Sequence, residues 1–361
     1  MLYFSLILLY ILSQYYVIVK TQHKLGVITL KFSVGYQLFS DDVFLDKIIT
    51  AKNDISEVYF SWADFPNGRN NQLKQKDLNH IEAQQKQMTD LKKLADNGIG
   101  LNLLFNATCY GKDSQSRAFF EKIGDTIDFI IKSYGLSCVT TTSLLIAKFI
   151  KNNFSNIDVR ASVNMSVGSI DAMEYIKDYF DSFYLKRELN RNFSEIRKLK
   201  SWCTDNGKQL YALANSGCLN NCSAHTFHDN LVSHEDEISK MDNAFSFEGV
   251  CKNFLKDKDN LYKIFEHTNF IRPEDVYLYE DLFTSMKLAT RVSNNSIRII
   301  DAYINKKYTG NTLDLLEPNH TNTVYPHILQ NNKITPEISH KELKYKNIEE
   351  SLIKLEEDIL C

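Results

Sequence analysis

The chain has 361 residues, of which 43% are hydrophobic and 24% charged, an ordinary globular composition with enough chain for a large core. The formal net charge of −3 provides no strong basic field, so binding of bulk nucleic acid is not indicated. The seven cysteines lack a regular spacing, which argues against a disulfide framework and favours a reducing, cytoplasmic compartment where thiols stay free or bind metal.

Residues 2–19 carry no charge and reach the lower length limit for a membrane-spanning helix. The segment has no positively charged start and no small-residue cleavage site, so it is a poor signal peptide. Three interpretations stay open for residues 1–29: a membrane anchor, a weak signal, or a spurious upstream extension. We expect the extension, with translation starting near Leu30, and keep a membrane-anchored protein as the alternative.

From residue 30 onward, short apolar runs alternate with amphipathic helical patterns, as expected of repeated βα units with parallel strands. Helices are expected near 41–52, 76–97, 115–133, 143–152, 169–179, 191–206 and 295–307. Strands are expected at 32–38, 55–62, 100–106, 136–141, 158–164, 182–187, 208–215 and 284–289.

Eight such units predict an α/β protein with a TIM-like (β/α)8 barrel over residues 30–317. The runner-up is an open doubly wound sheet, which usually has a Gly-rich turn after its first strand, and none follows Tyr36. Residues 216–283 form a long insertion between strands 7 and 8, and long loops of this kind tend to carry function. Residues 318–361 read as an irregular tail with a charged helix over 341–360. The chain stops abruptly at Cys361, which leaves a missing C-terminal piece open.

A dense group of soft metal ligands follows the seventh predicted strand. Cys218 and Cys222 form a Cys-x3-Cys pair, with His225 and His228 close behind. Thiol and imidazole groups packed this closely after a strand indicate a metal or cluster site. The histidines have helical spacing and are equally explained as polar residues lining a helix, so neither is chosen as a ligand.

Two further cysteines can complete this site if the fold is a barrel. The carboxyl ends of barrel strands meet at one face, which places Cys109, just past the third strand, beside Cys218 and Cys222. Cys251 comes from the insertion. Four thiolates suit a 4Fe–4S cluster or Zn2+; one close pair with two scattered cysteines favours the cluster, while the histidines keep a mixed zinc site open. Cys138 and Cys203 are expected in the core.

Charged residues at unusual positions are candidates for substrate contact. Lys287 interrupts an apolar strand, where a lysine is rare unless it is paired or functional. Glu274 lies in an Arg-Pro-Glu-Asp run that reads equally as a salt-bridged helix start or as a functional turn. Arg69 lies in a Pro-Asn-Gly-Arg turn that either is a surface turn or faces an anionic group. The sequence shows no nucleophile elbow, His-Glu-x-x-His motif, phosphate loop or hydrolytic triad.

Several motifs in order resemble peptidase family U32, the collagenase-like proteins. Residues 287–291, Lys-Leu-Ala-Thr-Arg, resemble that family's Lys-Ile-Glu-Gly-Arg signature and are likewise followed by a helix ending in Ala-Tyr. Residues 162–164, 187–191 and 215–218 fit the same family. The resemblance runs from about Lys31 to Glu317.

The resemblance implies a TIM-like barrel and, for several members, similarity to oxygen-independent hydroxylation proteins that act on ubiquinone precursors or RNA bases. Those members hold a 4Fe–4S cluster through four cysteines, whereas others are described as proteases of unknown catalytic type. The cysteines of this chain are more scattered than the usual set. Cys109 as the fourth ligand echoes members that take one ligand from an early strand.

We therefore expect a U32-like enzyme with a 4Fe–4S cluster held by Cys109, Cys218, Cys222 and Cys251. Its expected role is oxygen-independent hydroxylation or a related modification of a small-molecule, peptide or RNA substrate, with a partner subunit left open. The alternatives are a collagenase-like protease and a non-catalytic accessory or binding subunit. A cluster supplies electrons but does not recognise the shape of a substrate. We expect the substrate to be oriented by Lys287, Arg291, Glu274 and Arg187.

Overall fold

The computed structural model describes residues 30–39, 41–62, 65–69 and 78–355. The apolar 2–19 segment and Cys361 lie outside the described residues, so the predictions made for them stay predictions. Within the described ranges, no helix combines the length and the apolar character needed to cross a membrane.

Eight parallel strands form a closed barrel in which each strand pairs with the next in the chain and the last returns to the first. The TIM-like (β/α)8 fold predicted from the sequence is therefore confirmed. Seven of the eight strands lie within the predicted runs and are shorter than them, because the polar ends of those runs turn into the loops, and β1 begins one residue earlier than predicted. The strands are β1 (Lys31–Gly35), β2 (Ile55–Phe60), β3 (Gly100–Phe105), β4 (Cys138–Thr141), β5 (Asp158–Ala161), β6 (Ser182–Tyr184), β7 (Gln209–Leu213) and β8 (Ser285–Leu288).

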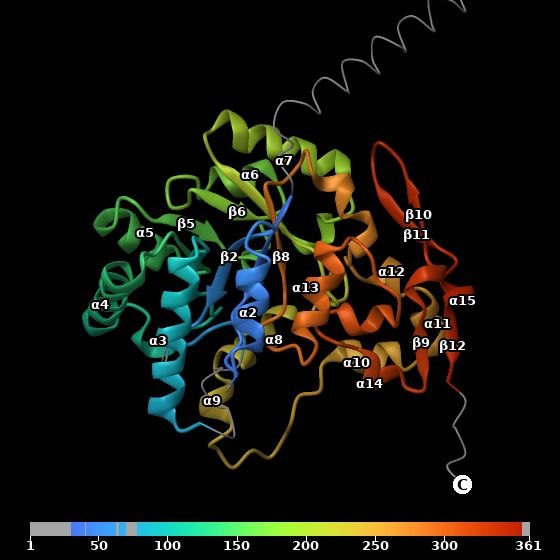
Figure 1. Cartoon of the computed structure of the whole chain (residues 1–361), viewed down its shortest axis with the longest axis horizontal. Helices are drawn as coiled ribbons and strands as arrows, with labels where there is room; N and C mark the ends of the chain where they lie inside the picture. Colours follow the sequence, from blue (N-terminus) through green and yellow to red (C-terminus); the bar gives the residue numbers. More distant parts are fainter. Residues whose placement is uncertain (1–29, 40, 63–64, 70–77, 356–361) are drawn as a thin grey trace, which may run out of the picture.

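Amphipathic helices cover the outside of the barrel (Figure 1). On α4, Ile123, Ile127 and Ile130 form one buried stripe at helical spacing. Asn79 begins α3 with a capping box that pairs it with Glu82. The barrel helices are α2 (Val43–Thr50), α3 (His80–Asp96), α4 (Arg117–Tyr134), α5 (Leu144–Asn153), α6 (Ile170–Glu174), α7 (Phe193–Asp205) and α13 (Ser296–Ile304). Cys138 and Cys203 are buried, as predicted.

The predicted insertion between β7 and β8 is present and consists of short helices. Its chain crosses the region beyond the carboxyl ends of the strands, and Asn190 helps to anchor it by donating to the carbonyls of Leu213 and Asn269. Its helical segments are α8 (His225–Ser233), α9 (Glu235–Ile238), α10 (Val250–Leu255), α11 (Lys258–Tyr262), α12 (Ile264–His267) and the 3-10 segment η4 (Pro273–Tyr279).

The charged helix predicted over residues 341–360 does not form as one element: in the described part, Leu343–Lys346 is a strand, Ile348–Ser351 a short helix and Leu352–Lys354 another strand. Leu343 and Tyr345 alternate with exposed lysines, and this period of two places their side chains against the protein as a strand does. The run of Lys and Glu resembles a solvated helix only when that alternation is overlooked. The tail comprises η5 (Thr312–Leu315), α14 (Thr321–Val324), β9 (His327–Leu329), η6 (Asn331–Lys333), β10 (Thr335–Ile338), β11 (Leu343–Lys346), α15 (Ile348–Ser351) and β12 (Leu352–Lys354).

Candidate functional site

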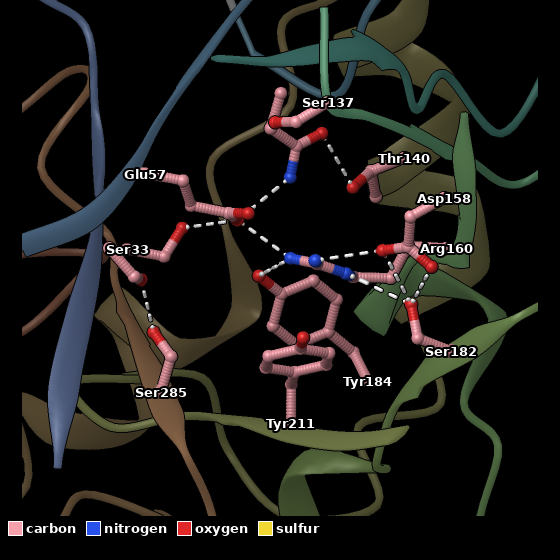
Figure 2. Close-up of polar contacts among 12 residues, drawn as sticks. Ser33, Glu57, Ser137, Thr140, Asp158, Arg160, Ser182, Tyr184, Tyr211 and Ser285 are labelled. Atoms are coloured by element: carbon pink, nitrogen blue, oxygen red, sulfur yellow. Dashed lines mark hydrogen bonds and ion pairs between the residues drawn. The ribbon is translucent and has the colours of Figure 1, made fainter. Parts of the chain in front are cut away.

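The middle of the barrel is filled by a polar network centred on Arg160 (Figure 2). Arg160 is 3% exposed, and its Nη1 lies 2.6 Å from Glu57 Oε1 while its Nη2 lies 2.9 Å from an Asp158 carboxylate oxygen. Its guanidinium also stacks over the Tyr211 ring at 3.9 Å. Burial works to raise the pKa of Glu57, but Arg160 and donated hydrogen bonds outweigh it and lower that pKa. The network closes the floor beneath the barrel mouth.

Sequence reasoning missed this floor, although a signal was present. Arg160 and Glu57 each interrupt a short apolar strand, just as Lys287 does. A charged side chain inside a strand of a barrel points either to the helices or to the lumen, and an unpaired charge is excluded from both places. Two side chains of opposite charge in different strands are therefore expected to point into the interior of the barrel and to form an ion pair there.

Lys287 lies one layer nearer the mouth, since it follows the floor residue Ser285 by two positions on β8. Its Nζ is 4.0 Å from the centroid of the Tyr59 ring, and the side chain is almost fully buried. Burial, and then the positive charge of Arg291, lower the pKa of Lys287 to about 7, while Glu57 acts in the opposite direction. Near neutral pH the amine therefore exists in both protonation states.

Arg291 and Arg187 come to the mouth from different loops. Burial, the largest effect, lowers the pKa of Arg291 to about 10, so this guanidinium stays charged at neutral pH. Gly35 is required beside it, because a Cβ there would lie 2.8 Å from the Arg291 Cβ and from the Tyr59 ring. The Nη2 of Arg187 donates to Asn164 Oδ1 at 2.8 Å.

His225 supports Arg187 from the first turn of α8. Its Nε2 is 2.8 Å from Arg187 Nη1, and an arginine only donates, so the imidazole accepts. Burial, followed by the charge of Arg187, lowers the pKa of His225 and favours the neutral ring that accepting requires. The histidine that first suggested a metal ligand is thus engaged in orienting an arginine.

Arg69 also lies at the mouth, so the functional interpretation of its turn is supported over that of a plain surface turn. Its Nε is 3.3 Å from Glu317 Oε1, and the neighbouring Gly68 donates its backbone N–H to Asn106 Oδ1 at 3.1 Å. Burial opposes the charge of Arg69, but Glu317, Cys218 and Asp229 outweigh it and raise the pKa of Arg69. The electrostatic influence of Cys218 on this arginine brings the cysteines into the same site.

Two adjoining hollows make up the site. The first, which we call the mouth pocket, is narrow, at about 50 Å3, and its charged lining residues are Lys287, Arg291, Arg187, Arg69 and Glu317. The second, the cysteine cavity, measures about 370 Å3. The two share Arg69, Val292 and Glu317 as lining residues, so they are contiguous. The cysteine cavity is lined by residues that include Cys218, Cys222, Cys251, His225, His228 and His320.

Three of the four predicted cluster cysteines come together. Cys218 and Cys222 lie between β7 and α8, and Cys251 lies on α10, yet all line the cysteine cavity. Burial first, and then the nearby charge of Cys218, raise the pKa of Cys251, and Cys222 adds to the effect. All three are free thiols of intermediate exposure.

Cys109 is not brought to the other three, contrary to prediction. It is not among the residues lining the cysteine cavity, and its Sγ accepts the backbone N–H of Gly111 at 3.5 Å. A hydrogen bond with His234 is the largest of the effects that lower the pKa of Cys109. The loop after β3 carries the thiol toward α8 and α9, a course that the position of the strand end does not reveal.

Glu274 likewise does not reach the mouth pocket. Its Oε1 accepts hydrogen bonds from the backbone N–H of Tyr308 at 2.7 Å and from Asn331 Nδ2 at 2.8 Å. Its neighbours Arg272 and Asp275 form a buried ion pair at 2.8 Å. Residues 272–275 therefore join η4 to the C-terminal tail. This role agrees with the interpretation of the run as a salt-bridged helix start, and Glu274 does not orient a substrate in the mouth pocket.

No three His, Cys, Asp or Glu side chains in the described part of the chain already stand in the arrangement of a single-ion metal site. The cysteine cavity is also lined by apolar residues, among them Leu219, Val250 and Val292.

Comparisons with known proteins were made for the whole chain. No family model matches. The chain is 26% identical over 275 residues to the uncharacterized protease MJ1657 of Methanocaldococcus jannaschii, a match that covers 74% of this chain and 76% of the relative. Among solved structures, the U32 peptidase Mk0906 aligns with 72% of this chain and 92% of its own at 14% identity and a TM-score of 0.48. A GH113 β-1,4-mannanase aligns with 77% of this chain at 8% identity and a TM-score of 0.38. The chain is thus similar to an uncharacterized protease over 74% of its length.

Proposed function

We propose that this U32-type protein binds a 4Fe–4S cluster in the cysteine cavity and acts on an anionic or carbonyl-bearing substrate held in the mouth pocket. The observation that carries the proposal is the contiguity of the two hollows. Cys218, Cys222 and Cys251 surround one, Lys287 and three arginines surround the other, and Arg69 lines both.

The donor set of the cysteine cavity suits a 4Fe–4S cluster. Such clusters are held by cysteine thiolates. Three thiols, those of Cys218, Cys222 and Cys251, line the one cavity. When bound, the cluster would give or accept one electron at a time.

The charges of the mouth pocket define its substrate. Arg69, Arg187 and Arg291 carry fixed positive charge, and Glu317 is the acid among them. A low-dielectric pocket with this excess favours a carboxylate, phosphate or polarised carbonyl, which arginine binds through paired hydrogen bonds. Because the pocket is narrow, we expect one small polar group to enter it while the rest of the substrate extends toward the cysteine cavity.

Lys287 is poised to move a proton at the bound group. Its neutral form accepts a proton and its charged form returns one, and a pKa near the working pH makes both exchanges easy. For oxygen-independent hydroxylation the overall balance is R–H plus water giving R–OH, two protons and two electrons. The two electrons leave to two equivalents of an external one-electron acceptor, and the protons need a base at the reacting group.

A peptidase is the second candidate, favoured by the name of the relative. A neutral, buried lysine amine can serve as the general base of a hydrolase, so Lys287 carries this alternative too. The narrow, strongly cationic mouth pocket suits it less, because an extended peptide needs a long groove. A non-catalytic accessory subunit is the third outcome, expected to show neither bound iron nor turnover.

Anaerobic purification with iron and sulfide analysis tests the proposal. The wild type should contain about four irons and four sulfides per chain. Cys218→Ser with Cys222→Ser should lose them, whereas the matched control Cys109→Ser should keep them. A protein that binds no iron after reconstitution, and that cleaves gelatin or casein in the presence of a chelator, would replace this proposal with the peptidase.

A further inference from the structure

His320 is held against the segment that carries the first cluster cysteine. Residues 215–217 run beside the chain at Glu317: Glu317 N–H donates to Asn215 O at 2.9 Å, and Gly217 N–H donates to Glu317 O at 2.8 Å. Only glycine fits at position 217, because a Cβ there would lie 2.5 Å from the carbonyl oxygen of Pro318. This close approach brings His320 alongside Gly217, the residue before Cys218.

The hydrogen bond that His320 makes determines which of its ring nitrogens carries the hydrogen and which one has a free lone pair. Its Nε2 lies 2.8 Å from Gly217 O. A carbonyl oxygen only accepts, so Nε2 carries the hydrogen and a neutral ring has its lone pair on Nδ1. Nδ1 is buried, in a side chain that is 1% exposed, and it has no hydrogen-bond partner within the described part of the protein. Leaving a buried acceptor unpaired is unfavourable, because its lone pair has given up water without gaining another partner.

The helix that begins after His320 is a neighbour of the helix that carries Cys251. His320 is the N-cap residue of α14, and α14 packs against α10, on which Cys251 lies. His320 therefore connects the Cys218 segment, through its hydrogen bond to Gly217 O, with a helix that packs on the Cys251 helix. All three residues line the cysteine cavity together with Cys222.

We propose that His320 is the fourth ligand of the site and binds one iron through Nδ1, which makes the ligand set Cys218, Cys222, Cys251 and His320. Metal-binding histidines almost always donate their second ring N–H to a carboxylate, a backbone carbonyl or water, as His320 does to Gly217. The proposal rests on the proposed function, since it takes the cluster at this site as its starting point. It fills the position that was expected for Cys109.

The other histidines of the cavity do not share this geometry. His225 already accepts from Arg187. His228 is half-buried and packs its ring against Phe247, with the ring centroids 5.3 Å apart. His228 lines the same cavity, so it is the natural control for His320.

Pulsed electron paramagnetic resonance of the reduced cluster tests the assignment. Full-length protein is reconstituted anaerobically with ferrous iron and sulfide, once unlabelled and once with 15N-histidine. The wild type should show a 14N coupling that changes to a 15N coupling on labelling. In His320→Gln the amide can still donate to Gly217 O, but no ring nitrogen remains, so the coupling should vanish. His228→Gln should retain it.

Iron analysis gives a second readout that does not depend on activity. A cluster without its fourth protein ligand readily loses an iron, so His320→Gln should fall from about four irons per chain to about three and show the signal of an oxidised 3Fe–4S cluster after air exposure. His320→Cys should restore four irons and show no histidine coupling, which separates a lost ligand from a damaged fold.

Each result decides between the two proposals. Four irons per chain without histidine coupling in the wild type, or with a coupling that survives His320→Gln or disappears in His228→Gln, overturns the ligand assignment and leaves the cluster standing. Iron absent from the reconstituted wild type overturns the cluster and the assignment together.

Discussion

Lys287 combines a buried position with a titration near neutral pH. In the folded protein its pKa is about 7, whereas an unfolded lysine titrates near 10.4. Between these values the unfolded chain binds more protons than the folded one. The free energy of unfolding contributed by this residue therefore rises with pH from about 7 to about 10, and below pH 7 the buried charge imposes its full cost.

Replacing Lys287 with Met should therefore stabilise the protein more at low pH than at high pH. We expect the gain in unfolding free energy at pH 6 to exceed that at pH 9.5 by on the order of 3 kcal/mol. This difference is the amount by which the cost of burying the charged Lys287 amine falls between the two pH values. Urea unfolding at the two pH values measures it. Lys92→Met, at an exposed site on α3, is the control, and an equal gain at both pH values would show that Lys287 does not titrate as a buried amine.

The Arg160–Glu57 pair predicts a large and non-additive loss of stability. Removing one partner leaves a buried charge without compensation, which typically costs about 3–5 kcal/mol. We expect Arg160→Met to lose stability on this scale and Glu57→Gln to lose less, since a neutral amide still pairs with Ser33 and Asn102. The double variant should be more stable than the sum of the two losses implies. Additive losses in the double-mutant cycle would mean that the two charges act independently.

At the scale of elements, the C-terminal tail stabilises the insertion that carries the cysteines. The Tyr345 ring of β11 packs on Phe265, with centroids 4.9 Å apart, and lies under the guanidinium groups of Arg191 and Arg272, each at 5.3 Å. Its hydroxyl accepts the backbone N–H of Arg272 at 3.0 Å. One side chain thus joins the tail, the insertion and the loop after β6.

Tyr345→Ala should lower the free energy of unfolding by about 3 kcal/mol, as expected for deleting a large aromatic side chain from a packed site. Thermal and urea unfolding measure the loss. Tyr325→Ala is the matched control, because that ring is 65% exposed and should change stability by less than about 0.5 kcal/mol. Equal stability of the two variants would show that β11 is not part of the cooperative unit.

At the scale of the whole molecule, the barrel is closed by strands that all lie after residue 30. Lys31 donates its backbone N–H to Thr284 O, which seals β1 against the start of β8. A chain beginning at Leu30, with a start Met, should therefore fold and unfold at the same melting temperature as the full chain. Aggregation of the shorter chain, with the full chain in the membrane fraction, would instead show that residues 1–29 are needed as an anchor.

The architecture could be predicted because its signals are local. Each strand is a short apolar run and each barrel helix an amphipathic one, and β1 to β8 were located from these patterns alone. The helix expected over residues 341–360 was wrong because a short exposed hairpin buries only Leu343 and Tyr345, too little to register as a strand in a charged segment.

Cys251 was predicted from its place in the insertion, and the other site residues could be predicted where they lie close in sequence or at a strand end. Cys218 and Cys222 are four residues apart, and Arg187, Lys287 and Arg291 directly follow or lie in strands that end at the mouth, so their grouping follows from the barrel. Cys251, Arg69 and Glu317 reach the site through loops, and Cys109 and Glu274 leave it the same way. Loop paths depend on contacts between distant segments, such as Gly217 against Pro318, that carry no periodic signal. The sequence by itself thus showed which residue types could supply the chemistry, whereas the tertiary structure decided that His320 lines the cysteine cavity and that Cys109 does not, because the tail pairs with the chain after β7 and the loop after β3 turns away.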